Sequence, residues 1–315
     1  MKVQLLVTLV LAVMVGAGSL NLLSAQDLSP RAYVITPVHS NAVTLTYLFS
    51  DGSIVLDGIS PLTGVTGIFH APILSFYHSL GIFGHSANIT ASLPYAVGTF
   101  HGTVQGEGMQ IYRSGFMDSS FRFAVNIKGG PALPVQEFAK WQQKVLLGVS
   151  LKVVAPTGQY DPMKLINWGT NRWSFKPELG YSERWGHWVL DGYGGAWFFT
   201  TNPEYFSHNQ YFPGTQSQSQ KPMGSFEGHL SYDVKPRFWF SLDGNFWFGG
   251  RVSLNGTEND NTLQTNSRVG ATVSIPVSKH QSLKVSYSDG VHIEYGGNYN
   301  SVSVGWQYGW LGKPN

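Results

Sequence analysis

One short stretch carries the residue types of a nucleophilic catalytic site, because His85, Ser86 and Asn88 stand close together. A histidine that activates a serine, itself oriented by a third polar group, is the usual arrangement for acyl transfer. Here all three residues fall on one predicted strand, so their side chains cannot converge on a single point. The Gly-x-Ser-x-Gly turn that exposes a serine nucleophile is also absent from the sequence.

The sequence also lacks a clear motif for binding a metal ion or a phosphate group. The ten histidines are scattered without ligand spacing, the chain has no cysteine, and a His-Glu-x-x-His motif is absent. There is no glycine-rich phosphate loop, and Gly192, Gly194 and Gly195 are better explained by tight strand packing. We therefore expect no catalytic centre, no cofactor and no metal site, and we expect that the chain is not an enzyme.

The charged residues have a clearer pattern, because many alternate with apolar residues along predicted strands. On 116–128, for example, Met117 and Phe121 are expected on one face and Asp118 and Arg122 on the other. A charge facing lipid at mid-bilayer costs about 2–4 kcal/mol, so such charges should point into the lumen of a barrel. The predicted lumen set is Asp118, Arg122, Lys152, Arg172, Lys176, Glu178, Glu227, Asp243, Arg268 and Lys284. These residues could form a selectivity ring, or they could form interior salt bridges that fill the barrel.

The elements that would position these charges are strands with one apolar face. The last of them is the clearest: its apolar face is Val302, Val304, Trp306, Tyr308 and Trp310, and small or polar residues alternate with them. Only 12% of the chain is charged and 14% is aromatic, and the net charge is +2, so a nucleic-acid partner is not expected. An aromatic final strand is also typical of the insertion signal that the barrel assembly machinery recognises, although Leu311 to Asn315 follow it here.

Period-two alternation predicts twelve strands and therefore an all-β, antiparallel transmembrane barrel. The predicted strands are 42–50, 72–80, 84–94, 115–128, 143–154, 171–182, 186–199, 223–233, 236–248, 263–275, 280–288 and 298–310. Connections after the second, sixth, eighth and tenth strands are predicted to be short, and those after odd-numbered strands to be long. The connection at 129–142, after the fourth strand, is longer than this pattern expects and could contain a helical turn at 135–142. Short turns on the periplasmic side would place both termini there.

The amino-terminal residues predict export. One positive charge, Lys2, precedes an apolar run from Val3 to Val15, and Ala25 offers a cleavage position. The run is short for a membrane-spanning helix, and no other stretch is long enough to form one. We expect a signal peptide over 1–25 and a single barrel domain over 26–315.

Several segments resemble those of a bacterial family, the putative MetA-pathway of phenol degradation family, over about 28–310. The segments are Ser86 to Tyr95, Ala155-Pro156-Thr157-Gly158-Gln159-Tyr160-Asp161-Pro162, Leu165 to Gly169 and Phe175 to Tyr181. The resemblance implies an outer-membrane transporter found with genes for aromatic degradation. The segment from Ala155 to Pro162 could fold inward as a constriction, or it could be a rigid loop that shapes the rim.

The expected function is a channel in the outer membrane of a Gram-negative bacterium. Small solutes, expected to be hydrophobic or aromatic, would diffuse passively through a narrow lumen, and the surrounding partner would be outer-membrane lipid. A structural or receptor-type barrel with a filled interior is the main alternative, and a lipid-modifying barrel enzyme is a third.

Overall fold

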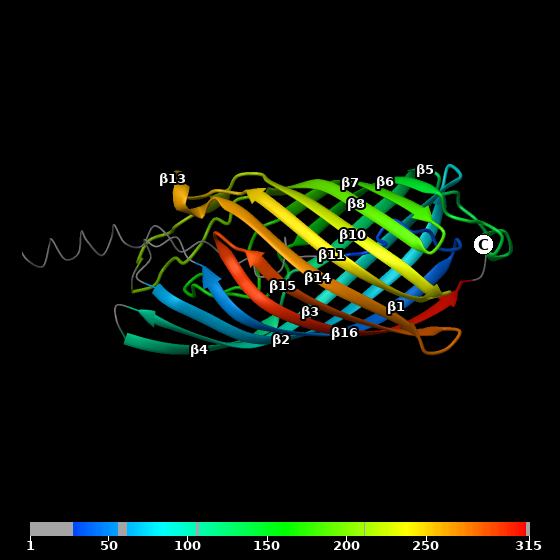
Figure 1. Ribbon diagram of the computed structural model, residues 1–315. Helices are drawn as coiled ribbons and strands as arrows, with labels where there is room; N and C mark the ends of the chain where they lie inside the picture. The colour runs from blue at the N-terminus through cyan, green and yellow to red at the C-terminus, as the bar shows by residue number, and fades with distance from the viewer. Residues whose placement is uncertain (1–27, 56–61, 105–106, 211, 313–315) are drawn as a thin grey trace, which may run out of the picture.

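Twelve antiparallel strands close into a barrel in the computed structural model (Figure 1). The structure describes residues 28–55, 62–104, 107–210 and 212–312, so the predicted signal peptide at 1–25 lies outside the described residues. The order around the barrel is β1-β2-β3-β5-β6-β7-β8-β10-β11-β14-β15-β16, and pairing of β1 with β16 closes it. No described helix is long and apolar enough to cross a membrane.

The barrel strands run from 10 to 21 residues, so all of them exceed the mean strand length of globular proteins, roughly five or six residues. Their bounds are β1 Ser40–Val55, β2 Leu62–Ile82, β3 His85–Val104, β5 Ser119–Lys128, β6 Val145–Ala155, β7 Ser174–Trp185, β8 Trp188–Phe199, β10 Met223–Lys235, β11 Phe238–Gly249, β14 Gln264–Pro276, β15 Gln281–His292 and β16 Gly296–Leu311. A further strand, β4 Glu107–Phe116, extends the wall beside β3.

The final strand shows why the sequence forms a barrel. Its five apolar residues lie on the outer surface, and their exposed fractions range from 36% to 43%. Ser301 and Ser303, on the other face, line the interior. This arrangement places the large apolar side chains where lipid would contact a membrane barrel and keeps the small polar ones inside.

Each predicted strand overlaps a strand of the structure, which confirms the twelve-stranded barrel. The prediction of loop lengths was wrong in two places. Only two residues separate β3 from β4, and only three separate β15 from β16, because these strands continue well past their predicted ends. The fourth predicted strand, 115–128, corresponds to β5 and the last two residues of β4; these two strands lie in line along β3 and are interrupted at Met117 and Asp118.

That interruption also corrects the predicted face of Met117. Its side chain is 7% exposed and packs in the interior with Phe69 and Phe100, whereas the alternation predicted that it faced lipid. The break between β4 and β5 shifts the alternation at this point, and Asp118 still reaches the cavity.

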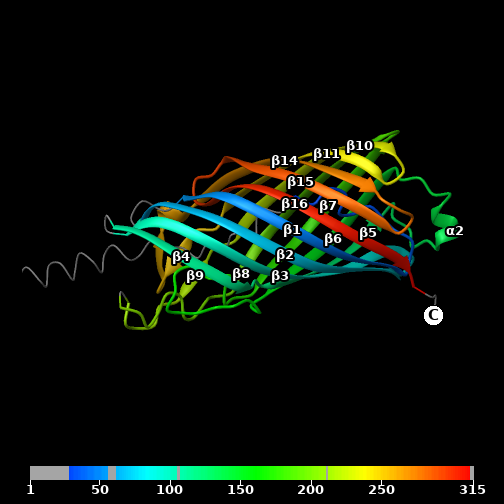
Figure 2. The same ribbon diagram turned by 90° about the horizontal axis from the view of Figure 1, so that it is seen from below.

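The two ends of the barrel differ (Figure 2). Short turns gather at one end, together with the helix α2 Val135–Phe138, which forms within the predicted helical segment. Long connections at 156–173, 200–222 and 250–263 gather at the other end. Within them, β9 Gln218–Gln220, β12 Val252–Leu254 and β13 Thr257–Asn259 form a small sheet, followed by the 3₁₀ turn η1 Asp260–Thr262.

Candidate functional site: a charged lumen and its amino-terminal segment

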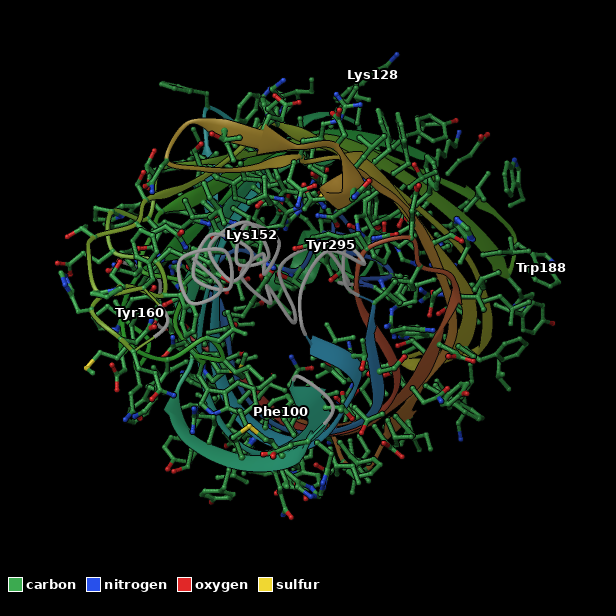
Figure 3. The ribbon with its side chains drawn as sticks, turned by 90° about the vertical axis from the view of Figure 1, so that its left-hand side faces the viewer. Phe100, Lys128, Lys152, Tyr160, Trp188 and Tyr295 are labelled. Atoms are coloured by element: carbon green, nitrogen blue, oxygen red, sulfur yellow. The ribbon has the colours of Figure 1, made fainter. Side chains whose placement is uncertain are left out.

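The barrel encloses a cavity of about 1290 Å³. Its lining includes Arg237 and Lys279 from the short-turn end, and Asn167 and Trp168 from the long-loop end. Seen along the barrel, Lys152 lies inside the wall, whereas Lys128 and Trp188 lie on its outer side (Figure 3). The cavity therefore extends along the barrel between the two ends.

A stretch of chain before β1 lies inside this lumen. Residues 28–36, here called the lumen segment, contribute seven of the residues that line the cavity. Tyr33 is its most buried member, at 1% exposure. The Tyr33 hydroxyl lies 3.0 Å from Ser150 Oγ and donates a hydrogen bond of 3.0 Å to Glu178. Burial, and secondarily the charge of Glu178, raises the pKa of Tyr33 to about 12.

Two glycines form a notch that accepts the Tyr33 ring. Gly148 on β6 and Gly180 on β7 stand directly opposite each other in the strand register. A Cβ atom on either glycine would overlap the ring, so no other residue fits without displacing Tyr33. Tyr193 packs edge-to-face against the ring at 5.1 Å, and the Arg122 guanidinium lies 4.7 Å from the ring centroid on another side.

Arg31 anchors the lumen segment nearer to the short-turn end. Its guanidinium lies 2.6 Å from Asp233 and 4.4 Å from the centroid of the Trp239 ring. Its backbone N–H donates to Asp191 at 3.2 Å. Burial lowers the pKa of Arg31, an effect that Asp233 opposes. Because arginine keeps its charge when its pKa falls somewhat, this ion pair persists at ordinary pH.

The central charges of the predicted set meet around Lys176. Its ammonium lies 2.6 Å from Glu178 and 2.7 Å from Glu227, and all three side chains are less than 10% exposed. Arg122 lies 3.7 Å from Glu178. The strand register places Arg122 opposite Lys152 and Lys152 opposite Lys176, so three cations form a row across β5, β6 and β7.

A second group of interacting polar side chains adjoins this row at Glu227. His229 lies between two carboxylates, at 2.8 Å from Asp243 and 3.7 Å from Glu227. Thr272 donates a hydrogen bond of 2.8 Å to Asp243. The side chains of this group are almost completely buried, as expected of interior ion pairs in a barrel wall.

Most of the predicted lumen residues lie at the cavity. Those that line it are Asp118, Arg122, Lys152, Lys176, Glu178, Glu227, Arg268 and Lys284. Arg172 and Asp243 do not line the cavity, and both are buried in the wall, at 2% and 5% exposure. Arg172 donates to Gln220 and lies over the Phe199 ring, away from the lining. Arg122, Lys176, Glu178 and Glu227 thus take part in interior ion pairs and also line the cavity, and the effect of the predicted charges on ion selectivity stays a prediction.

Asp118 fastens the long loop at 156–173 to the break between β4 and β5. Its carboxylate accepts hydrogen bonds from the backbone of Gly158 and Thr170, both at 2.9 Å, and from the Thr170 hydroxyl at 2.6 Å. Between these two points of the loop, the Trp168 ring lies 5.7 Å from the Phe69 ring and reaches the cavity. Asn167, Trp168 and Thr170 bring this loop partly inward, whereas no residue from Ala155 to Pro162 lines the cavity, so the role of that segment as a constriction or as a rigid loop stays a prediction.

The stretch with catalytic residue types does not form a site in the structure. His85 is exposed at the start of β3, whereas Ser86 and Asn88 are buried on the strand. No hydrogen bond among the described residues joins them. Among the same residues, no cluster of three or more acidic or histidine side chains could hold a metal ion.

The lumen segment was not predicted from the sequence. Its residues have no period-two or helical pattern, and they precede the first predicted strand. The sequence feature that could have indicated a docked segment is the pair Arg31 and Tyr33, which lies between prolines at positions 30 and 37. A charged and an aromatic residue in a short, otherwise irregular stretch gain a role only when distant strands supply their partners.

Comparisons with known proteins place the fold. A family model described as "Putative MetA-pathway of phenol degradation" matches residues 69–306. The COG4313 outer membrane channel of Pseudomonas putida F1 superposes with a TM-score of 0.74 at 17% identity, covering 90% of this chain and 100% of that one. The transport unit of the autotransporter AIDA-I of Escherichia coli gives a TM-score of 0.49 at 13% identity, covering 92% and 94%. No curated protein matches the chain.

Proposed function

Because the chain belongs to the family described as "Putative MetA-pathway of phenol degradation", we propose that it is an outer-membrane channel for small solutes, expected to be hydrophobic or aromatic, which diffuse passively through its lumen. The observation that carries this proposal is the cavity inside the closed barrel, whose lining includes residues from both ends. A barrel that served only as a membrane anchor would not need this cavity, because side chains could fill its interior as they do in eight-stranded barrels.

The proposed orientation follows from the loops. Short turns of outer-membrane barrels face the periplasm and longer loops face outward. This would place α2 and the entrance of the lumen segment on the periplasmic side. The lumen segment then narrows the pathway from that side, and the inward part of the loop at 156–173 narrows it from the other.

A filled structural or receptor-type barrel remains the competing function, and the observation in its favour is the lumen segment itself. Tyr33 and Arg31 occupy space that a solute would otherwise cross. If the segment stayed in place permanently, the barrel could fold normally and yet conduct little.

Single-channel recording in planar bilayers tests the proposal. We expect the purified barrel to give discrete conductance steps in potassium chloride. Removal of residues 28–36 from the mature chain should increase the step size, because the segment lies inside the cavity. A correctly folded barrel that conducts neither with nor without the segment would exclude the channel and favour the filled barrel.

A further inference from the structure

The tyrosine of the lumen segment is held by the wall as a small ligand would be held. The Tyr33 side chain is a phenol ring with one methylene group, and all the groups that bind its hydroxyl come from distant strands. The hydroxyl donates a hydrogen bond to Glu178 at 3.0 Å, and Ser150 Oγ lies 3.0 Å away, where it can donate to the same oxygen. Both hydrogen-bonding functions of a phenol, one donor and one acceptor, are therefore matched by the wall.

The pocket also fits the aromatic ring. Gly148 and Gly180 present bare backbone to the ring, and a side chain at either position would take its place. Tyr193 contacts the ring edge-to-face, and the Arg122 guanidinium lies 4.7 Å from the ring centroid. An aromatic edge and a cation over the ring face are contacts that any free aromatic ring could gain in the same position.

The groups that form this pocket belong to the wall of the lumen. Arg122, Ser150, Glu178 and Tyr193 all line the cavity. They come from strands β5, β6, β7 and β8, which are neighbours in the barrel. A solute in the lumen can therefore reach these groups when the Tyr33 ring leaves the pocket.

The lumen segment can detach without breaking the sheet. Among the described residues, the one backbone-to-backbone hydrogen bond of 28–36 joins Val34 to Arg31 inside the segment, at 3.2 Å. The hydrogen bonds that join the segment to the wall involve wall side chains, such as the Tyr193 hydroxyl, which accepts from the Ala32 N–H at 3.0 Å. Detachment of the segment therefore leaves the strand pairing of the barrel intact.

We infer that this pocket is a binding site for a free hydroxylated aromatic ring, and that Tyr33 occupies it as a tethered competitor until such a solute displaces it. The inference rests on the proposed channel function and adds a binding site and a form of regulation, because displacement withdraws the lumen segment from the pathway. The ion pair between Arg31 and Asp233 anchors the segment at a second point and keeps the ring near its pocket. A short tether gives an effective concentration on the order of millimolar, so displacement is expected at millimolar solute.

Cysteine labelling tests the inference, because the chain has no cysteine of its own. Ile35 in the lumen segment is 3% exposed, so Ile35→Cys should react slowly with a maleimide until the segment leaves. The compound p-cresol reproduces the Tyr33 side chain and should accelerate this reaction. Toluene lacks the hydroxyl and leaves Ser150 and Glu178 unpaired, so the same acceleration should need a concentration about fivefold higher or more. Lys128→Cys, on the outer side of the barrel (Figure 3), is the control and should react at a rate that neither compound changes.

A second measurement removes the tethered competitor. Tyr33→Gly leaves the pocket without its own ring, so p-cresol should bind this variant at a lower concentration than it needs to displace the ring of the wild type. Gly180→Ala in the same variant should abolish this binding, because its Cβ atom takes the space of the ring. Gly192→Ala is the matched control, because a Cβ there meets nothing within 4 Å, and it should leave the binding unchanged.

The outcomes separate this inference from the channel proposal. If p-cresol does not accelerate labelling of Ile35→Cys, or acts no better than toluene, the inference is overturned even where the channel conducts. Binding to Tyr33→Gly without displacement in the parent barrel would overturn it too, because Tyr33 would then be a permanent anchor. Displacement in a barrel that does not conduct would support the pocket and remove the channel. If Ile35→Cys does not migrate as a folded barrel, Ala32→Cys replaces it.

Discussion

The ring of Tyr33 occupies the space in which a side chain at Gly180 would have to lie. The two residues belong to distant parts of the chain, and the contact joins the lumen segment to the wall of the barrel. Gly148, opposite Gly180, completes the notch. Since these glycines sit in strand interiors, where glycine weakens a strand, their presence is best explained by the close approach of Tyr33.

Closing the notch should release the lumen segment without unfolding the barrel. Gly180→Ala is expected to displace the Tyr33 ring and to increase single-channel conductance. Tyr33→Ala should do the same, because it removes a buried ring whose packing contributes on the order of 3 kcal/mol. The two changes together should add little to either alone, since both act on one contact. Gly192→Ala is the matched control, because a Cβ there meets nothing within 4 Å; an equal effect from this variant would contradict the notch.

Alkaline pH should also release the segment. The pKa of Tyr33 is raised by burial to about 12, above its ordinary value of 10, so docking favours the protonated phenol. The stabilisation is complete below pH 10 and is lost as pH rises through 12, by about 1.4 kcal/mol per pH unit. Conductance of the wild type should therefore rise across this window more than that of Tyr33→Phe, which cannot ionise. Identical pH profiles of the two proteins would exclude Tyr33 as the titrating group.

Asp118 should control the loop at 156–173. Asp118→Asn removes one acceptor oxygen from a carboxylate that receives three hydrogen bonds, at a cost of about 1–3 kcal/mol. We expect faster proteolysis of the loop on the folded barrel. Asp161→Asn is the control in the same loop, because its ion pair with Lys164 is exposed and contributes less than about 1 kcal/mol. Equal cleavage of both variants would mean that Asp118 does not hold the loop.

Lysine substitutions at two neighbouring residues of β15 should have different effects, because one residue lies on the outer surface and the other lines the cavity. Val285 is 40% exposed on the outer surface, and Ser286 lines the cavity. Val285→Lys should destabilise the barrel in lipid by about 2–4 kcal/mol if it lies near mid-bilayer, whereas Ser286→Lys should cost far less. Heat-modifiable migration and urea unfolding in lipid vesicles would measure the difference. Similar losses for both lysines would argue against a lipid-facing outer surface at this strand.

Features of the fold that depend on neighbouring residues could be predicted from the sequence, and features that depend on distant residues could not. In β16 the alternation of Trp306, Tyr308 and Trp310 with small residues needs no distant information, and strand and faces were both predicted correctly. In β3 and β4, glycines such as Gly98 and Gly102 blur the alternation, so the long hairpin was read as a loop. Tyr33 acquires its place from Ser150 and Glu178, more than a hundred residues away, and no local pattern records that contact.

The carboxyl end of β16 should act as the insertion signal. Trp310 pairs with Asn41 on β1, at the seam that closes the barrel, and its ring lies 6.4 Å from Phe76 on the outer surface. Deleting 310–315 removes this aromatic end and is expected to lower the amount of folded protein in outer-membrane fractions. Deleting only 311–315 leaves Trp310 in place and should have little effect, and Trp310→Phe should likewise be tolerated because it keeps an aromatic ring. Normal outer-membrane levels of the longer deletion would show that assembly does not depend on Trp310.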